Sequence, residues 1–264
     1  SYRYFYLNKM NNFKKQRILN INVNILSAIE FLNLIKGFLF TRKSHYICVS
    51  NVHQCIEAYD NKEFAEVINN ADLVISDSRP IYWALKLFNH KEAEQLTGYN
   101  STKSLCKFAS ENNLSIGFYG GEKDSLEKCV LNLKKEYQGI KIDYFYSPPF
   151  RVLTNEEKKD IISDINKSEI KFLFVCTGCP KQEYWMAEHK EYLNCISVGV
   201  GEVVDLISGK MKLTPKWIHN IGMRWLTRLI ADPRRLFWRY FYTNSKFIYL
   251  FFKQYLKFKI NINK

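Results

Sequence analysis

The chain has 264 residues, of which 47% are apolar, so it is long enough to bury a core and too apolar for a disordered chain. Its net charge of +13 is concentrated near the end: from Lys212 to Lys264 there are twelve Lys or Arg and one acidic residue, a net charge of +11. Such a segment predicts an anionic partner, which is nucleic acid, an anionic lipid surface or a phosphorylated substrate.

Residues 1–16 are polar and basic and are expected to form a flexible arm. They lack an apolar core with a cleavage site, so we predict no secretory signal. The seven cysteines stand at irregular spacing, which favours reduced thiols in a cytosolic protein. No run of about 18 apolar residues occurs, so no transmembrane helix is predicted.

After the arm, short apolar runs alternate with helical patterns. Glu122–Tyr137 and Asn155–Lys167 carry apolar residues at helical spacing. The alternation predicts an α/β fold with a Rossmann-like parallel sheet and helices on both faces, in a domain that spans 17–211. The predicted strands are Ile47–Ser50, Leu73–Ser76, Ser115–Tyr119, Lys141–Tyr146, Lys171–Cys176 and Cys195–Val198.

Residues 212–264 lack a convincing strand pattern and are predicted to form a basic helical appendage. We expect two helices divided at Asp232-Pro233, because proline disfavours helix at the preceding residue and suits the first turn of the next helix. The second helix is expected to span Arg234–Tyr255.

The appendage has three candidate roles. It could bind nucleic acid, lie on an anionic membrane, or close over a diphosphate. Its thirteen Phe, Trp and Tyr residues are too many to leave in water. No recognised nucleic-acid-binding motif accompanies the charge.

Asp77 follows a predicted strand, and ligand sites in parallel sheets form at the carboxyl ends of strands. Its carboxylate has two interpretations. It is either a general base that accepts a proton from an attacking hydroxyl, or the N-cap of the helix that follows. The spacing alone leaves both open.

A second strand end runs into Gly178-Cys179-Pro180-Lys181-Gln182-Glu183. Gly178 lets a ligand approach the backbone, Pro180 suits a first helical turn, and the N–H groups of a helix start can bind phosphate. A well-capped connection without a ligand fits the same residues. Gly199-Val200-Gly201 and Gly120-Gly121 are weaker nucleotide signals, because Val204 stands where a dinucleotide fingerprint has its third glycine.

Cys176 and Cys179 have the spacing of a redox or zinc pair, but no second pair at zinc spacing accompanies them. Their surroundings favour a ligand turn instead. His53, His189 and His219 are isolated in the sequence, so neither a metal site nor a cofactor is predicted.

Several segments, in order across roughly 17–242, together resemble the WecG/TagA/CpsF family of bacterial glycosyltransferases. The Pro-Lys-Gln-Glu block and the Pro-Arg-Arg tail are the specific parts of this resemblance. The similar segments are Asp77-Ser78-Arg79-Pro80-Ile81-Tyr82-Trp83-Ala84, Leu96-Thr97-Gly98-Tyr99-Asn100, Gly178–Trp185, Gly199-Val200-Gly201 with Asp205 and Gly209, Pro215-Lys216-Trp217, Trp225-Leu226 and Asp232–Leu236.

The resemblance implies an inverting, metal-independent enzyme that moves a hexose or N-acetylhexosamine from a UDP-sugar to a sugar on a polyprenyl diphosphate. Donors of this family include N-acetylmannosamine, its uronic acid and glucose-like hexoses, and the products are cell-surface polysaccharide or teichoic acid. The appendage is then expected to complete the active site and to hold the enzyme on the anionic inner face of the cell membrane. No nucleic acid partner is expected on this interpretation, and a homo-oligomer is left open. Nucleic-acid binding by the basic aromatic helices is the alternative function.

By motif match, Asp77 takes the place of the catalytic base, and Asn51 and Gln182 face the donor sugar. Single-displacement inversion needs the base opposite the leaving UDP. Without a metal, the 178–182 turn and arginines must stabilise the leaving diphosphate. The predicted substrate-binding residues are Asn51, Arg79, Thr97, Gly98, Tyr99, Asn100, Gly120, Gly178, Pro180, Lys181, Gln182, Glu183, Gly199, Gly201, Asp205, Arg228, Arg234, Arg235 and Arg239.

The chain departs from the family pattern at four positions. Val49 replaces a frequent Thr, Gln95 a frequent Arg, Asn100 the usual Asp and Arg224 a usual Glu. These departures leave the identity of the donor sugar open. Arg79 is a candidate to supply the charge that Gln95 lacks.

Overall fold

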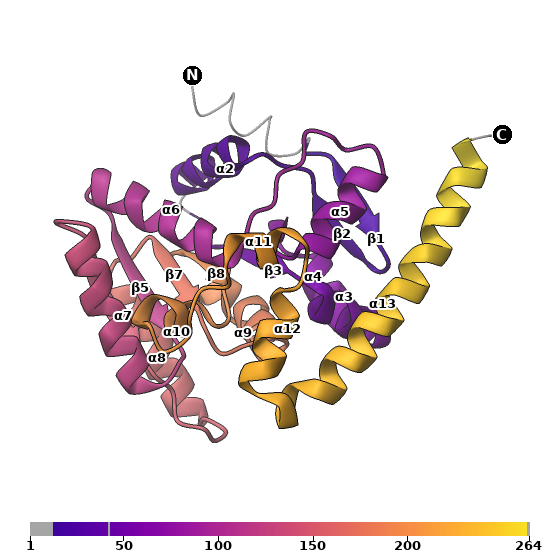
Figure 1. The fold of residues 1–264 in the computed structure, drawn as a ribbon. Helices are drawn as coiled ribbons and strands as arrows, with labels where there is room; N and C mark the ends of the chain where they lie inside the picture. Colours follow the sequence, from indigo (N-terminus) through magenta and orange to yellow (C-terminus); the bar gives the residue numbers. More distant parts are fainter. Residues whose placement is uncertain (1–12, 42, 263–264) are drawn as a thin grey trace. The chain divides into compact units, whose positions relative to one another are not determined.

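The computed structural model describes residues 13–41 and 43–262 (Figure 1). Its main sheet has six strands in the order β4-β3-β8-β7-β5-β6, and the neighbouring strands from β3 to β6 pair in parallel. Helices accompany this sheet, so the predicted Rossmann-like α/β fold is confirmed. The strands are β3 (His45–Ser50), β4 (Leu73–Ser76), β5 (Ser115–Tyr119), β6 (Lys141–Tyr146), β7 (Phe172–Val175) and β8 (Ile196–Gly199).

Four strands of this sheet are buried along their whole length. Every residue of β3, β4, β7 and β8 is buried, including the Phe-Leu-Phe-Val run of β7. Parallel strands covered on both faces read as continuous apolar runs of this kind. All six strands were therefore visible in the sequence, and their ends differ from the prediction by at most two residues.

The described chain divides into two compact units. The first unit holds residues 31–48 and 98–212, and the second holds residues 13–30, 49–97 and 213–262. Residues 213–262 therefore belong to a compact unit together with earlier parts of the chain. The boundary predicted at 211/212 between a catalytic domain and an appendage stays a prediction.

The first unit contains β5, β6, β7 and β8, residues 45–48 of β3, and several helices. The helix α10 packs on α7, where Asn132 donates a side-chain hydrogen bond to the Ile207 carbonyl at 2.9 Å (Figure 1). The helix α8 begins with a capping box between Thr154 and Glu157. The helices are α2 (Ala28–Thr41, from Phe31 onward in this unit), α6 (Gly98–Glu111), α7 (Lys123–Glu136), α8 (Asn155–Lys167), α9 (Lys181–His189) and α10 (Val203–Ser208), with a 3-10 turn η1 (Lys190–Tyr192).

The second unit begins with an antiparallel hairpin that the sequence analysis missed, formed by β1 (Lys15–Ile18) and β2 (Ile21–Asn24). The strand β1 starts inside the segment predicted as a flexible arm, whose residues 1–12 lie outside the described residues. The hairpin turns at Leu19, which has a positive φ of 52°. Tight hairpin turns usually carry Gly or Asn at such a position, so this turn gave no sequence signal.

Six helices complete the described part of the second unit. They are α3 (Val52–Asp60), α4 (Lys62–Asn69), α5 (Arg79–Leu87), α11 (Lys216–Asn220), α12 (Arg224–Ala231) and α13 (Pro233–Ile262). The break predicted at Asp232-Pro233 is confirmed, because Pro233 is the first residue of α13. The tail nevertheless has three helices where two were expected, since α11 is too short to show a helical period.

The long helix α13 lies along α3 (Figure 1). Its inner face buries Leu236, Tyr240, Thr243 and Phe247, which recur at helical spacing. At the end of α3, Asp60 accepts a hydrogen bond from Tyr242 at 2.8 Å and pairs with Lys246. Among the described residues, no helix combines the length and the apolar character needed to cross a membrane.

Candidate functional site

The predicted site residues fall into two groups, one in each compact unit. The first unit holds Gly98, Tyr99, Asn100, Gly120, Gly178, Pro180, Lys181, Gln182, Glu183, Gly199, Gly201 and Asp205, and the second holds Asn51, Asp77, Arg79, Thr97, Arg228, Arg234, Arg235 and Arg239. Each group is described by itself.

In the first unit, the turn after β7 is shaped by Gly178 and Pro180. Gly178 has a positive φ of 83°, and the peptide bond between Cys179 and Pro180 is cis. Pro180 is the N-cap of α9 and Lys181 its first residue, so the proline stands just before the helical turn that the sequence predicted for it. The N–H of Gln182 closes the turn on the Gly178 carbonyl at 2.9 Å.

Gln182 is buried and connects three parts of this group. Its side-chain nitrogen donates to the Glu183 carboxylate at 2.7 Å, and its side-chain oxygen accepts from the Gly201 N–H at 3.0 Å. Glu183 is fully buried, whereas Lys181 is exposed. Gln182 therefore ties the start of α9 to the loop after β8, and its predicted contact with the donor sugar stays a prediction.

Four of the five predicted glycines, those outside α6, differ in what surrounds them. A Cβ at Gly120 would lie 2.7 Å from the Cys176 carbonyl carbon, and one at Gly199 would lie 2.7 Å from the Met186 methyl group. These two glycines are thus required for packing inside the protein. A Cβ at Gly178 would meet nothing within 4 Å, and one at Gly201 would meet only Gln182, at 4.0 Å. Only Gly178 and Gly201 therefore leave their backbone open to a ligand.

Two polar atoms beside this turn are buried and have no hydrogen-bond partner within the described chain. They are the Thr177 hydroxyl, directly before Gly178, and one carboxylate oxygen of Asp205 in the first turn of α10. The same Asp205 oxygen lies 3.9 Å from the Lys210 amine. Buried polar atoms almost always bond to something, so both atoms are suited to meet polar atoms of a ligand.

The start of α6 carries the remaining predicted residues of the first unit. Gly98 is buried as the first residue of the helix, Tyr99 is half-buried and Asn100 is exposed.

An aromatic stack behind the turn was not predicted. Trp185 lies between Tyr119 and His189, with ring centroids 4.5 and 4.7 Å apart, and the rings are nearly parallel. Burial raises the pKa of Tyr119 to about 12, so its hydroxyl keeps its proton. The stack holds α9 against the end of β5, and only the folded arrangement reveals it.

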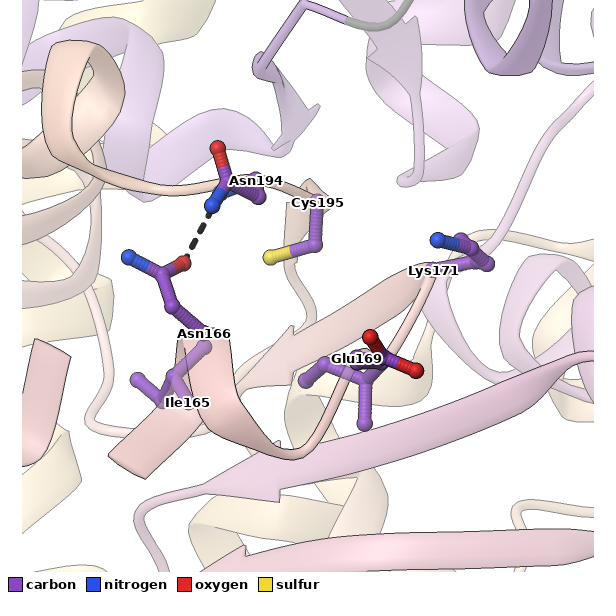
Figure 2. Close-up of a pocket in the computed structure, with 7 residues that line it drawn as sticks. Ile165, Asn166, Glu169, Lys171, Asn194 and Cys195 are labelled. Carbon is purple, nitrogen blue, oxygen red and sulfur yellow. Dashed lines mark hydrogen bonds between the residues drawn. The ribbon is translucent and has the colours of Figure 1, made fainter. Parts of the chain in front are cut away.

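A cavity of about 170 Å³ occurs elsewhere in the first unit (Figure 2). It lies at the amino ends of two strands, since Lys171 precedes β7 and Cys195 precedes β8. Asn194 and Asn166 line it and are joined by a hydrogen bond of 3.0 Å (Figure 2). Ligands of parallel sheets bind at the opposite, carboxyl ends, and none of the predicted site residues lines this cavity.

Cys176, one of the two cysteines at redox spacing, is unsuited to thiol chemistry. Cys176 is buried, and burial raises the pKa of its thiol well above the usual value, which disfavours the reactive thiolate. All cysteines of the chain are free thiols. Within the part of the chain that the structure describes, no group of three or more His, Cys, Asp and Glu could hold a metal ion. The expectation of a metal-free enzyme stays a prediction.

In the second unit, Asp77 stands directly after β4 and before the helix cap. The N-cap of α5 is Ser78, so the capping interpretation of Asp77 is wrong. The Asp77 N–H donates to the Ser50 carbonyl at 2.8 Å, and the Gln95 side-chain nitrogen donates to the Asp77 carbonyl at 2.6 Å. The backbone of Asp77 is therefore held on both sides, and its role as general base stays a prediction.

Asn51 and Thr97 flank Asp77 at neighbouring chain segments. Asn51 is the N-cap of α3, and its side-chain oxygen accepts from the Gln54 N–H at 3.0 Å, which fixes the direction of its amide. Thr97 is buried, next to Leu96, whose N–H donates to the Ser76 carbonyl at 2.8 Å.

Arg79 joins this group to the C-terminal segment. Its guanidinium donates a hydrogen bond to the Asn220 side chain in α11 and lies 5.4 Å from the Tyr82 ring. The turn that follows α11 also packs on α5. A Cβ added at Gly222 in this turn would lie 2.8 Å from the Trp83 ring. No pattern in the sequence indicated that α11 contacts the segment after Asp77.

Two arginines lie close to a histidine, His53, near the start of α3. Burial and the charges of Arg239 and Arg228 lower the pKa of His53 to about 4. The Arg239 Nε is buried and has no hydrogen-bond partner within the described chain. Two guanidinium groups beside a helix N-terminus form a favourable place for an anion such as phosphate. His53 was missed because it is isolated in the sequence.

The other two predicted arginines stand apart from this cationic group in exposure and partners. Arg234 and Arg235 are both exposed. Arg235 pairs with Asp232 through a 2.5 Å contact in the first turn of α13, which partly neutralises its charge. The predicted contacts of all four arginines with phosphate stay predictions.

The fold is that of a Rossmann-like α/β protein with polar candidate site residues after several of its strands and a basic helical C-terminal segment. The chain belongs to the glycosyl transferase WecG/TagA/CpsF family, because the model of that family matches residues 16–261.

Two curated relatives carry the same name, N-acetylglucosaminyldiphosphoundecaprenol N-acetyl-beta-D-mannosaminyltransferase. The protein from Bacillus subtilis (strain 168) is 24% identical over 216 residues, which cover 81% of this chain and 82% of the relative. The protein from Bacillus spizizenii (strain ATCC 23059 / NRRL B-14472 / W23) is 24% identical over 212 residues, covering 80% of each.

Proposed function

We propose that this chain transfers N-acetylmannosamine, or a related hexose, from a UDP-sugar to N-acetylglucosamine carried on a polyprenyl diphosphate. The relatives' printed names supply the sugar and the acceptor, and the family supplies the reaction class. The observation that carries the proposal is Asp77, a carboxylate after β4 that is not a helix cap and whose backbone is held by Ser50 and Gln95.

Asp77 is the proposed general base. It takes the proton of the acceptor hydroxyl while that oxygen forms a bond to the anomeric carbon and the bond from this carbon to UDP breaks. A single displacement of this kind inverts the anomeric centre, so an α-linked donor gives a β-linked product. The leaving UDP takes the electron pair of the broken bond.

The leaving diphosphate needs positive charge or oriented N–H groups. In the first unit, the open backbone at Gly178 and the N–H groups at the start of α9 are suited to this task. Arg228 and Arg239, which lie in the second unit, stay predicted phosphate ligands. No metal is needed when these groups stabilise the charge, so a chelator is expected to leave the rate unchanged.

The outer face of α13 is proposed to lie on an anionic membrane surface, where a lipid-linked acceptor is found. Trp238, Phe241, Ile248 and Phe252 are each at least 60% exposed and recur at helical spacing. Arg234, Lys253 and Lys257 are exposed on the same helix. Aromatic and basic residues on one helix are typical of helices that lie in a membrane interface.

The direct test is a transfer assay with purified protein, a panel of UDP-sugars and a short-chain lipid diphosphate of N-acetylglucosamine. A lipid product with one added N-acetylmannosamine in β linkage would support the proposal. Transfer of a different hexose would change the donor but keep the reaction class. Binding of duplex or single-stranded nucleic acid that falls steeply with salt, without transfer or vesicle binding, would favour the alternative function.

A further inference from the structure

His219, in the short helix α11, lies against the segment that holds Asp77. Its Nε2 atom is 3.4 Å from the Gln95 side-chain nitrogen. The same nitrogen donates to the Asp77 carbonyl at 2.6 Å. One amide group of Gln95 therefore bridges the proposed base and a histidine from the C-terminal segment.

The geometry fixes the tautomer of His219. An amide nitrogen can only donate, and its short bond to the Asp77 carbonyl shows that the Gln95 nitrogen, not its oxygen, faces this pair. The Nε2 of His219 must then be the acceptor, which places the ring proton on Nδ1. The neutral ring is the form that fits the observed arrangement.

Some groups around His219 lower its pKa and others raise it. Burial and the charges of Arg224 and Arg79 lower the pKa of His219, whereas the Asp77 carboxylate and a hydrogen bond with Asn220 raise it. The net direction is downward, so the ring is neutral at neutral pH and gains its proton only in acid.

We propose that His219 is a positioning residue for the base Asp77, and that protonation of its ring switches this base off. The inference rests on the proposed function. A protonated Nε2 would set a second donor against the Gln95 amide, so the ring or the amide must turn away and the bond to the Asp77 carbonyl is lost. The new positive charge would also stabilise the Asp77 carboxylate and make it a weaker base.

The first test compares the pH dependence of kcat in four proteins: wild type, His219→Gln, His219→Arg and His90→Gln. The His90 variant is the matched control, because His90 is a half-buried histidine of the same unit that bonds to Gln16, outside the site. We expect the wild-type kcat to rise with pH through the pKa of His219. In His219→Gln an uncharged acceptor replaces the ring, so this acid limb should move to lower pH while the neutral rate stays within about threefold.

His219→Arg places a permanent donor and cation beside Gln95. Its kcat should fall about tenfold or more at every pH, with KM for the UDP-sugar within about twofold, because misplacing a base affects the chemical step more than donor binding. His90→Gln should follow the wild type. An acid limb unchanged in His219→Gln, or a normal kcat in His219→Arg, would overturn the inference.

A second measurement needs no activity. Imidazole NMR of the full chain can follow the titration of His219 in the wild type and in Asp77→Asn. Removal of the carboxylate charge should lower the pKa of His219 further, whereas an unchanged titration would overturn the coupling. If the wild type transfers no sugar at any pH, the proposed function fails, and this titration still decides whether His219 and Asp77 are coupled.

Discussion

The backbone N–H of Gly201 donates a hydrogen bond to the side-chain oxygen of Gln182 at 3.0 Å. The side-chain nitrogen of the same glutamine donates to Glu183, so a single buried amide joins the loop after β8 to the first turn of α9. Because the amide is almost completely buried, its loss would leave the Gly201 N–H and the Glu183 carboxylate without this partner in an apolar setting.

We therefore expect Gln182→Leu to lower the free energy of unfolding by about 1–3 kcal/mol. Urea denaturation of the full chain would measure the change. Lys181→Ala is the matched control, since Lys181 is the exposed neighbour in the same helical turn and should change stability by less than about 0.5 kcal/mol. Equal losses in the two variants would show that the bridge has no special role.

Gly178 and Gly209 form a natural pair for testing the proposed diphosphate turn. Both have φ near 80°, and a Cβ at either position would meet nothing within 4 Å. Replacing either by Ala should cost about 1 kcal/mol of stability through the backbone alone. Only Gly178→Ala is expected to weaken UDP binding, by about tenfold, because a methyl group there would block approach to the turn. Calorimetric titration with UDP measures this, and equal affinities in the two variants would remove Gly178 from the site.

His53 predicts a pH dependence of stability. Its pKa is lowered to about 4 in the folded chain, whereas an unfolded histidine titrates near its ordinary value. Between these values the unfolded chain binds a proton that the folded chain does not, so stability falls as the pH falls through this window. The loss reaches up to about 3 kcal/mol near pH 4 and vanishes above about pH 7.

Replacing His53 by Gln should remove that part of the pH dependence. Urea denaturation of both proteins at pH 7.5 and pH 5 would isolate the contribution of His53 to the pH dependence of stability, because the two proteins share all other titrating groups. Parallel pH profiles for the wild type and His53→Gln would contradict the electrostatic account of the Arg228 and Arg239 group.

Substitutions can test the outer face of α13 without changing its buried inner face. Deleting residues after 212 would also remove Leu236, Tyr240 and Phe247, which are buried in the second unit. Changing Trp238, Phe241, Ile248 and Phe252 to Gln spares these residues. We expect this variant to fold and to bind anionic phospholipid vesicles at least about tenfold more weakly.

A control for this experiment is available in the first unit. Phe150 and Val152 are 95% and 89% exposed in the loop after β6, so changing both to Gln removes apolar surface of a similar kind. Vesicle sedimentation should show normal binding for that control. Undiminished binding by the α13 variant would mean that another surface meets the lipid.

The sequence predicted the parts of the fold that depend on local pattern. The buried strands, the Asp232-Pro233 break and the α8 boundaries follow from apolar runs and from proline chemistry. The β1–β2 hairpin was missed because its turn residue, Leu19, gives no turn signal.

The sequence motifs located Asp77 and the Gly178 turn as candidates, but they could not distinguish glycines that serve packing from those open to a ligand. Gly120 and Gly199 prove to be packing positions only because Cys176 and Met186 approach them in space. His53 and His219 were isolated in the sequence for the same reason: their partners are brought to them by tertiary contacts of the C-terminal helices.

The measurement that tests the central claim most directly compares sugar transfer by the wild type and by Asp77→Asn, alongside UDP binding by both proteins. We predict that the wild type adds N-acetylmannosamine from its UDP-linked donor to the lipid-linked acceptor. Asp77→Asn should retain UDP affinity within about threefold and lose at least about a hundredfold in kcat, because the amide cannot accept the proton. A near-normal rate in Asp77→Asn, or the absence of transfer with any UDP-sugar at a membrane surface, would contradict the account.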